Sequence, residues 1–417
     1  MKKLSVYIPT YNRKEHLKRQ LEFIFSDAEE YLSEIEVIVS DNASDDGTNE
    51  MAKAMQEKYP FAYYRNEKNL GIVTNALLSS EYCKGEFLWL IGDDDYIERG
   101  VIKKLFQIFT AYPDVNFIFL NHANMYGKVM DYGYSYPVVP PEFCTGYFEN
   151  ALPLVMNNFE VIGPQLVLTT AHLLRREIWN KTTDLLPCTA IESYGLNMVA
   201  PLAAIKMGKS YFDPEISTYG NYANFSWRKE AFQSFYGTQL SILKLKDLGY
   251  AENEVVEINR ALLERNLALL NELRREIPDL DEEKVLQFEN YLLQSANHPL
   301  KRLSKRETRI LFPYLDFFKN KRVVIYGAGR IGNALHQTCM DHGIEVAAWC
   351  DRNYRQLQRD GKKVDAPEII ADLEFDLVLD AVGDPSSLED IFNLMASLGV
   401  DKSRIKVTIP EYRMIIQ

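Results

Sequence analysis

Cysteine is scarce in this sequence, and its spacing suits neither disulfides nor a metal cluster. The chain of 417 residues holds five cysteines, an odd number, and no two of them form a CxxC pair. This argues against a disulfide framework and against a cysteine-rich zinc site. A reducing compartment is therefore the expected environment.

Long hydrophobic runs are also missing. No stretch approaches the 18 apolar residues that a membrane-spanning helix needs. The apolar run Leu4–Ile8 follows two lysines but stops at Pro9, which is too short for the core of a secretory signal. We expect a cytoplasmic protein, and peripheral contact with the inner face of the membrane stays open.

Positive charge is in deficit. Lys and Arg number 47 against 59 Asp and Glu, which gives a net charge of -12. An acidic surface disfavours nucleic acid as a partner, although backbone donors or a metal could still hold a small anion. The hydrophobic share of 47% is ordinary for a globular protein, and the length favours two or three domains.

The first 110 residues alternate strand and helix patterns. The predicted strands are Leu4–Ile8, Glu36–Ser40, Phe61–Arg65 and Glu86–Ile91, with helices expected over 14–32, up to about Tyr59, and over 71–83. Such alternation predicts an α/β fold with a mainly parallel sheet, helices on both faces, and ligands at the carboxyl ends of the strands.

Three units are expected along the chain. Residues 1–228 would form the first domain, with a further strand at Asn116–Leu120 and a long loop with a helix over 131–160. Residues 229–318 have leucines at helical spacing and are predicted to be a helical connector, which makes a homodimer plausible. Its basic cluster within 301–309 is either a solvated helix face or a contact for anionic lipid. Residues 319–417 would form a second α/β domain.

Polar clusters follow three of the predicted strands. Asp93, Asp94 and Asp95 come directly after an apolar strand, where three carboxylates repel one another unless a cation such as Mg²⁺ or Mn²⁺ is bound. A surface acidic turn is the alternative. Asp41 suits a base or ribose contact, or the capping of the next helix.

Four sequence segments occur in order: SVYIPTYNR, VIVSDNASDDGT, NEKNLGIVTNAL and KGEFLWLIGDDD. Together they resemble the family 2 glycosyltransferases of the GT-A fold. Within that family the chain looks most like the abequosyltransferase-type bacterial enzymes of surface-polysaccharide synthesis. The resemblance covers about residues 1–228.

The resemblance implies a binding site for a nucleotide-sugar donor. The residues it assigns to the donor are Pro9, Thr10, Tyr11, Arg13, Asp41, Asn69, Gly71, Asn75, Asp93 and Asp94. Asp93 and Asp95 match the outer members of the family's DXD motif. By that match Asp95 is the direct ligand of Mn²⁺ or Mg²⁺, and Asp93 contacts ribose or a metal-bound water. For Asn69, Gly71 and Asn75, ordinary turn chemistry is the alternative.

The resemblance also implies a Glu-Asp pair that includes the general base. Glu192 is the candidate, but Ser193 stands where the family has aspartate. A surface glutamate that begins a helix is the other interpretation of Glu192, and Asp184 is a weaker candidate. His122 and His172 could reach the metal, although a structural role is favoured because no paired spacing supports ligation.

The implied activity is transfer of a sugar, with inversion, from a nucleoside-diphosphate sugar to a glycan or lipid-linked acceptor. Residues 221–228 mix aromatic, amide and basic side chains, and they suit either sugar stacking or a packed loop. A non-catalytic protein that binds sugar nucleotides is the alternative that Ser193 permits.

The last unit carries GxGxxG between a predicted strand and a helix. Gly327, Gly329 and Gly332 form this pattern, and Asp351 ends the next strand. The context predicts a Rossmann-like domain that binds NAD or another nucleotide. Because no catalytic Tyr-Lys or Cys-His pattern accompanies it, we favour a binding or structural module over an NAD-dependent oxidoreductase.

Overall fold

The structure is a computed structural model. It describes residues 2–125, 137–186, 191–221, 231–276, 286, 289–290, 308–312, 314–383, 387–408 and 410–414. The basic cluster, except Arg309, and residues 222–228 of the aromatic segment lie outside this part of the chain, as do residues 131–136 of the predicted 131–160 loop.

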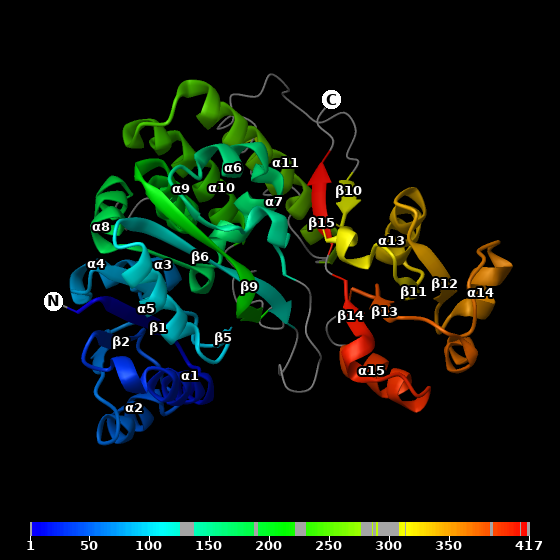
Figure 1. Ribbon diagram of the computed structural model, residues 1–417, viewed down its shortest axis with the longest axis horizontal. Coiled ribbons are helices and arrows are strands. Elements are labelled where there is room, and N and C mark those ends of the chain that lie inside the picture. The colour runs from blue at the N-terminus through cyan, green and yellow to red at the C-terminus, as the bar shows by residue number, and fades with distance from the viewer. Residues whose placement is uncertain are drawn as a thin grey trace.

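One mixed sheet organises the N-terminal part (Figure 1). Its strands run in the order β3-β2-β1-β4-β8-β6-β9-β5, and β7 pairs with β9. The strands are β1 (Leu4–Thr10), β2 (Ile35–Asp41), β3 (Ala62–Arg65), β4 (Phe87–Leu90), β5 (Tyr96–Ile97), β6 (Val115–Met125), β7 (Gly146–Phe148), β8 (His172–Arg175) and β9 (Lys209–Asn221).

The first four strands are all parallel, as the strand–helix alternation predicts. Thr10 lies opposite Asp41, and Asp41 lies opposite Arg65, so the carboxyl ends of β1, β2 and β3 meet at one edge. The later strands depart from a mainly parallel sheet: β8 is antiparallel to β4 and β6, and β5 and β7 are antiparallel to β9. β6 nevertheless pairs parallel with β9. The sheet as a whole is therefore mixed, while the parallel arrangement predicted for the first 110 residues holds for β1 to β4.

Helices cover both faces of the sheet, as expected (Figure 1). On one face, α1 (Lys14–Asp27), α2 (Thr48–Gln56) and α5 (Val101–Ala111) bury apolar side chains against alternate residues of β1, β2 and β4. The opposite face packs the α6–α9 layer and α11 against the other set, which includes Tyr7 and Leu88. Residues that alternate along each strand thus enter two separate cores.

The second layer is built mostly from short helices. It contains α3 (Ile72–Leu77), α4 (Ser79–Tyr82), α6 (Leu152–Asn157), α7 (Phe159–Ile162), α8 (Arg176–Leu185), α9 (Leu196–Met207), α10 (Ala231–Ser241) and α11 (Glu252–Glu276). The 3₁₀ segments η1 (Glu29–Tyr31), η2 (Pro141–Phe143), η3 (Gly163–Val167), η4 (Thr169–Ala171), η5 (Ile191–Gly195) and η7 (Ile242–Leu248) connect elements of the N-terminal part.

The predicted connector is helical over α10, η7 and α11, but its end is not. Val255, Ile258 and Leu262 of α11 belong to the same core as the sheet face. Thr308–Leu311 forms the strand β10, which pairs antiparallel with β15 (Glu411–Met414). The helical prediction is wrong there, because the partner strand lies about a hundred residues away and local periodicity carries no sign of it.

The C-terminal unit has its own sheet of four parallel strands in the order β12-β11-β13-β14. These are β11 (Arg322–Tyr326), β12 (Glu345–Cys350), β13 (Leu377–Asp380) and β14 (Ile405–Val407), and the first three match the predicted spans. The remaining elements are α13 (Arg330–Asp341), α14 (Tyr354–Arg359), α15 (Leu388–Ser397), η8 (Leu315–Phe318), η9 (Pro367–Asp372) and η11 (Lys402–Arg404). The predicted fold class, an α/β protein with a further parallel sheet, is confirmed.

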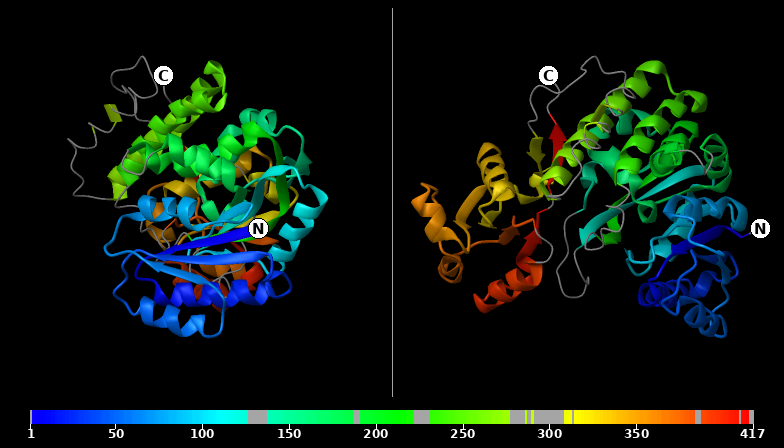
Figure 2. Two further views of the ribbon diagram at one scale, coloured as in Figure 1. Left: turned by 90° about the vertical axis from the view of Figure 1, so that its left-hand side faces the viewer. Right: turned by 180° about the vertical axis from the view of Figure 1, so that it is seen from behind.

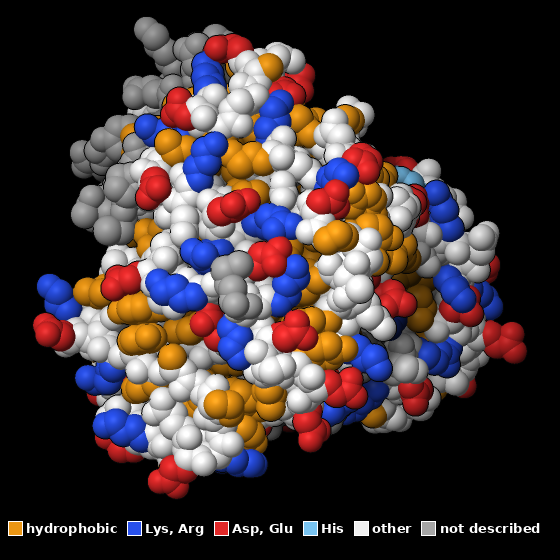
Figure 3. All heavy atoms as spheres, turned by 60° about the vertical axis from the view of Figure 1, so that its left-hand side comes forward, with side chains coloured by type: hydrophobic (Ala, Val, Ile, Leu, Met, Phe, Trp, Pro, Cys, Tyr) orange, Lys and Arg blue, Asp and Glu red, His pale blue; other side chains and the backbone are white. Residues whose placement is uncertain are grey.

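The C-terminal unit meets the rest of the chain at α11, as Figure 2 shows from two further sides. β15 packs on α11, and the Asn271 side chain donates a hydrogen bond to Thr308 Oγ1 over 2.7 Å. On the face drawn in Figure 3, acidic and basic side chains are interspersed. Among the described residues, we find no helix with both the length and the apolarity to cross a bilayer.

Candidate functional site

Three consecutive carboxylates follow β4. Asp93 and Asp95 are buried, with 2% and 7% of their surfaces exposed, and Asp94 is partly buried. Gly92 permits this turn because a Cβ there would lie 2.6 Å from Asp95 Oδ2. A carboxylate folded this closely over the backbone requires glycine at the preceding turn position.

Arg13 is the cation that faces two of these carboxylates. Its Nη1 donates to Asp93 Oδ1 over 2.8 Å and lies 3.1 Å from Asp94 Oδ2. Thr10 Oγ1 donates to the other oxygen of Asp93 over 2.7 Å. Although burial opposes the charged form of Arg13, Asp93 and Asp94 raise its pKa above the ordinary value. Ion pairs of Arg13 with Asp93 and Asp94 thus connect the loop after β1 to the loop after β4.

Asp95 points the other way, toward the second half of the sheet. Thr170 Oγ1 donates to Asp95 Oδ2, and the backbone N–H of Asn221 donates to Oδ1 over 3.1 Å. Burial raises the pKa of Asp95 to about 6, and the charge of Asp94 adds to the effect. Burial likewise raises the pKa of Asp93 to about 6, against the opposing effect of Arg13.

The donor set suits a divalent cation only if the ligand contributes to its coordination. Carboxylate oxygens are what Mg²⁺ and Mn²⁺ prefer, and hydrogen bonds such as those from Thr170 orient a carboxylate without using all its lone pairs. Within the described residues, however, no group of three or more His, Cys, Asp or Glu side chains could hold a metal ion. The residues fit a metal shared with phosphate oxygens rather than one caged by protein.

Asp41, at the end of β2, is fully buried and bound to protein groups. Its oxygens accept from the N–H of Ser44 over 2.9 Å and from the hydroxyl of Tyr63 over 2.6 Å, and Arg65 Nε lies 3.4 Å away. It does not cap α2, because Asp46 accepts from the N–H of Thr48 instead. Asp41 thus fixes the start of the loop between β2 and α2.

Amide side chains tie the β2 loop to the NEKNLG segment. Asn75 is buried: its Oδ1 accepts from Ser40 Oγ over 2.7 Å, and its Nδ2 donates to the Ser40 carbonyl over 3.0 Å. Asn42 Nδ2 donates to Asn69 Oδ1 over 2.8 Å, and Gly71 has a φ of 84°. Asn69 and Asn75 therefore fix the NEKNLG segment against the end of β2 and the loop that follows it. Asn42, which bonds Asn69 and Leu70, was not singled out from the sequence. Its position directly after a buried strand, in the SDN segment, was the available signal.

The β1 loop supplies an exposed aromatic ring at the same edge. Tyr11 is 44% exposed, and the next residue, Asn12, accepts from the N–H of Asp45 over 2.8 Å. Pro9 lies opposite Ser40 in the register, one residue before β1 ends at Thr10. The structure thus gathers Pro9–Arg13, Asp41 and Asp93–Asp95 at one sheet edge, with Asn69, Gly71 and Asn75 bound to its β2 loop.

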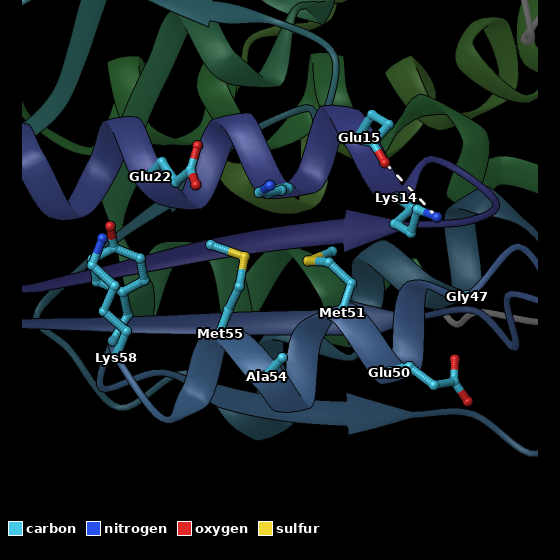
Figure 4. Close-up of a pocket in the computed structure, with 11 residues that line it drawn as sticks. Lys14, Glu15, Glu22, Gly47, Glu50, Met51, Ala54, Met55 and Lys58 are labelled. Atoms are coloured by element: carbon cyan, nitrogen blue, oxygen red, sulfur yellow. Dashed lines mark ion pairs between the residues drawn. The ribbon is translucent and has the colours of Figure 1, made fainter.

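The large groove in Figure 4 lies elsewhere, between α1 and α2. It has a volume of about 800 Å³, and its floor carries Met51 and Met55 while Lys14 pairs with Glu15 at one end. None of the predicted site residues lines it. We therefore do not connect this groove with the polar edge of the sheet.

The candidate base lies on η5, just before α9. The backbone of Glu192 is part of this 3₁₀ segment, but its side chain is outside the described residues. Ser193 is buried, and its hydroxyl donates to the Leu186 carbonyl over 3.2 Å, so the serine serves packing. Asp184 is exposed on α8. The assignment of Glu192 stays a prediction.

Both histidines considered as ligands are buried in the core layer. His172 packs edge-on against Phe117 and His122 against Phe119. Burial lowers the pKa of each imidazole to about 3, so both are neutral at physiological pH. Neither belongs to a possible metal group within the described part of the chain, and a structural role is the better interpretation.

In the C-terminal unit, the predicted glycine turn and Asp351 do come together. Gly327 has a φ of 108°, and a Cβ on Gly332 would lie 2.0 Å from the Gly327 carbonyl oxygen, so both positions require glycine. Asp351 Oδ2 accepts from the N–H of Ala328 over 2.7 Å. Gly329 has open space around it. The acid that would contact a ribose is here bound to the turn itself.

Two family models match the chain. Residues 5–142 match the model described as glycosyl transferase family 2, and residues 319–406 match the model described as C2185-like, N-terminal. The two matches fall on the two sheets, and neither match supports NAD as a ligand.

Curated relatives match part of the chain. An abequosyltransferase, RfbV of Salmonella typhimurium, is 38% identical over 114 residues, which cover 27% of this chain and 34% of that protein. A chondroitin synthase of Escherichia coli is 23% identical over 144 residues, 34% of this chain and 21% of that protein. The chain thus spans about a third of the first of these relatives and a fifth of the second.

Solved structures of S. aureus TarS share the fold. The 1-349 fragment superposes with a TM-score of 0.53 at 16% identity, covering 70% of this chain and 81% of that one. The fragment in complex with UDP-GlcNAc gives the same TM-score, identity and coverage. At this level of identity the likeness shows that the N-terminal unit is GT-A-like.

Proposed function

We propose that the chain is an inverting glycosyltransferase that moves a sugar from a nucleoside-diphosphate sugar to a glycan or lipid-linked acceptor in surface-polysaccharide synthesis. One observation carries the proposal. The β1 loop, the end of β2 and the aspartates after β4 converge at a single sheet edge, where Arg13 bonds Asp93. The sequence match to family 2 glycosyltransferases covers these same segments.

The donor would lie across this edge. Tyr11 offers an exposed ring for stacking, and the Asn42–Asn69 hydrogen bond holds the neighbouring loop in place. Asp95, oriented by Thr170 and the N–H of Asn221, is the proposed direct metal ligand. A bound Mn²⁺ or Mg²⁺ would offset the negative charge of the nucleoside diphosphate as it leaves.

The acceptor side rests on Glu192. A carboxylate at this position would take the proton from an acceptor hydroxyl as the hydroxyl attacks the anomeric carbon from the face opposite the leaving group. Direct displacement of this kind inverts the anomeric centre. The base lies on η5, whose Gly195 packs so tightly on α10 that a Cβ there would clash with Ser241 Oγ. Such packing is suited to fixing the position of a catalytic segment.

The experiment that tests the donor site is thermal stabilisation by UDP, GDP, CDP and dTDP, each with Mn²⁺ and with EDTA. We compare wild type with Asp95→Asn and with Glu15→Gln, a matched change at a side chain that is 78% exposed. Metal-dependent stabilisation by one nucleotide, lost only in Asp95→Asn, supports the proposal. Absence of any nucleotide response in the wild type contradicts it.

Transfer itself is tested by release of nucleoside diphosphate from the matching sugar donor in the presence of a glycan or polyprenyl-linked acceptor panel. Glu192→Gln should bind the donor normally but turn over at least about a hundredfold more slowly, because only the proton transfer is lost. Normal binding by the wild type without turnover on any acceptor would favour the non-catalytic alternative.

A further inference from the structure

Arg13 occupies the place where a positive charge is needed. It bridges Asp93 and Asp94, and the charge of Asp95 also raises its pKa. The guanidinium therefore already offsets part of the repulsion between these carboxylates.

Arg13 contacts the two carboxylates beside the proposed direct metal ligand, Asp95. Asp93 accepts from Thr10 on one oxygen and from Arg13 on the other, and Arg13 also faces the outer oxygen of Asp94. Arg19 donates to the backbone carbonyl of Asp95 over 3.0 Å, which adds positive charge on the same side. A metal ion that approaches without a nucleotide therefore meets a cation already bound.

Burial strengthens this competition. The Arg13 side chain is 22% exposed and that of Asp93 only 3%. A charge pair so poorly solvated interacts more strongly than one at the surface, and separating it leaves an unpaired buried carboxylate. Displacing the guanidinium must therefore be offset by new partners for both groups.

We propose that Arg13 is a resident counter-cation that excludes a divalent metal from the aspartate cluster until a nucleoside diphosphate binds. The diphosphate would supply a partner for each cation. Its oxygens would complete the coordination of the metal, and its negative charge would pair with the guanidinium of Arg13. This inference rests on the proposed donor site, but it concerns the order of binding. Arg13 acts as a positioning residue rather than a catalytic one.

The test measures binding of Mn²⁺ alone, from the free-ion signal in electron paramagnetic resonance, without any nucleotide. Wild type should bind weakly. Arg13→Gln, which keeps a polar side chain but no charge, should bind Mn²⁺ at least about tenfold more tightly because the competing charge is gone. Arg13→Lys should fall between them, because an ammonium keeps the charge but lacks the fork that bridges two carboxylates.

A gain in metal affinity is a readout that damage to the fold would not produce. If Arg13→Gln folds and binds Mn²⁺ no more tightly than wild type, the inference is wrong. It is equally wrong if no variant binds Mn²⁺ at all. Should Arg13→Gln fail to fold, judged by circular dichroism, Arg13→Lys decides: tighter binding than wild type supports the inference, and equal or weaker binding overturns it.

Adding the nucleotide separates this inference from the proposed function. With the nucleoside diphosphate that stabilises the protein most, the difference in Mn²⁺ affinity between wild type and Arg13→Gln should shrink or reverse. If no nucleotide binds, the proposed donor site fails, while the comparison made with Mn²⁺ alone still stands. If nucleotide binds but the gap stays at its nucleotide-free size, the displacement by diphosphate is refuted.

Discussion

The chain has two similar sheet edges, one in each α/β unit. They differ in the partners that their acidic side chains find. Each has parallel strands, a turn after the first strand and an acid after the next. In the C-terminal unit, Asp351 accepts hydrogen bonds from the backbone N–H groups of Ala328 and Asn353. In the N-terminal unit, three carboxylates are adjacent: Asp93 and Asp94 share Arg13, and Asp93 and Asp95 are buried.

The comparison shows that a parallel sheet topology alone does not identify a functional site. Strand ends of parallel sheets gather polar groups in both units. Burial raises the pKa of Asp380, at the end of β13 in the C-terminal unit, to about 6, so a raised pKa does not distinguish the two edges. The N-terminal edge is distinguished by three consecutive carboxylates, of which Asp93 and Asp95 have their pKa raised to about 6 by burial. Carboxyl groups with a raised pKa are candidates for function at either edge, and we assign the chemistry to the N-terminal edge because the match to family 2 glycosyltransferases covers it.

The largest effect is expected at Asp95. Asp95→Asn should reduce sugar transfer by about a hundredfold to a thousandfold, since it weakens the stabilisation of the leaving diphosphate. The matched change in the other unit, Asp351→Asn, should leave the transfer rate within about twofold. Initial rates of nucleotide release measure both. A comparable loss of transfer rate in the two variants would contradict the assignment of catalysis to the N-terminal edge.

Next in size is the effect of glycine substitution. Gly92→Ala places a Cβ against Asp95 Oδ2, so it should displace that carboxylate and destabilise the fold by about 1–3 kcal/mol. Gly329→Ala, which meets nothing within 4 Å, should change stability by less than about 0.5 kcal/mol. Urea unfolding reports both, and a harmless Gly92→Ala would show that the turn is looser than described.

The pH dependence of stability should come in part from the buried histidines. Because the folded pKa of His122 and His172 is about 3, below the ordinary value of 6.5, the unfolded chain takes up protons first as the pH falls. Their stability contribution is complete above about pH 6.5 and is lost below it, by up to about 1.4 kcal/mol per pH unit for each histidine.

His172→Gln should therefore flatten the acid limb of the stability curve relative to wild type, measured by denaturant unfolding between pH 4 and 7. His342→Gln, at an exposed histidine, is the matched control and should leave the slope unchanged. Equal slopes in wild type and His172→Gln would contradict the burial argument.

The smallest effect concerns the junction of the two units. Arg330, at the start of α13, donates from Nη2 to Glu272 Oε1 on α11 over 2.8 Å, and its side chain is 40% exposed. Glu272→Gln should cost about 0–1 kcal/mol, as partly solvated ion pairs do, and should not alter transfer. Calorimetry and the rate assay check this. A large loss of activity would mean that the C-terminal unit controls the N-terminal site.

Sequence patterns predicted most of the local structure. The strands at β1, β2, β4 and β11 to β13 lie where apolar runs end in turn residues. The ordered segments around Arg13, Asp41 and Asp95 predicted a common edge, and the structure brings them together there. The domain limits and the roles of the site residues stay predictions.

The sequence by itself determined which residues would lie at strand ends, because period-two burial and turn chemistry are local properties. The tertiary structure decided the partners. It set β8 antiparallel to β4, paired β10 with β15, turned Asp41 toward Ser44 and Tyr63, and placed Arg13 between two carboxylates. Those choices depend on which distant segments share one core and one edge, and no periodicity within a window of the chain carries that information.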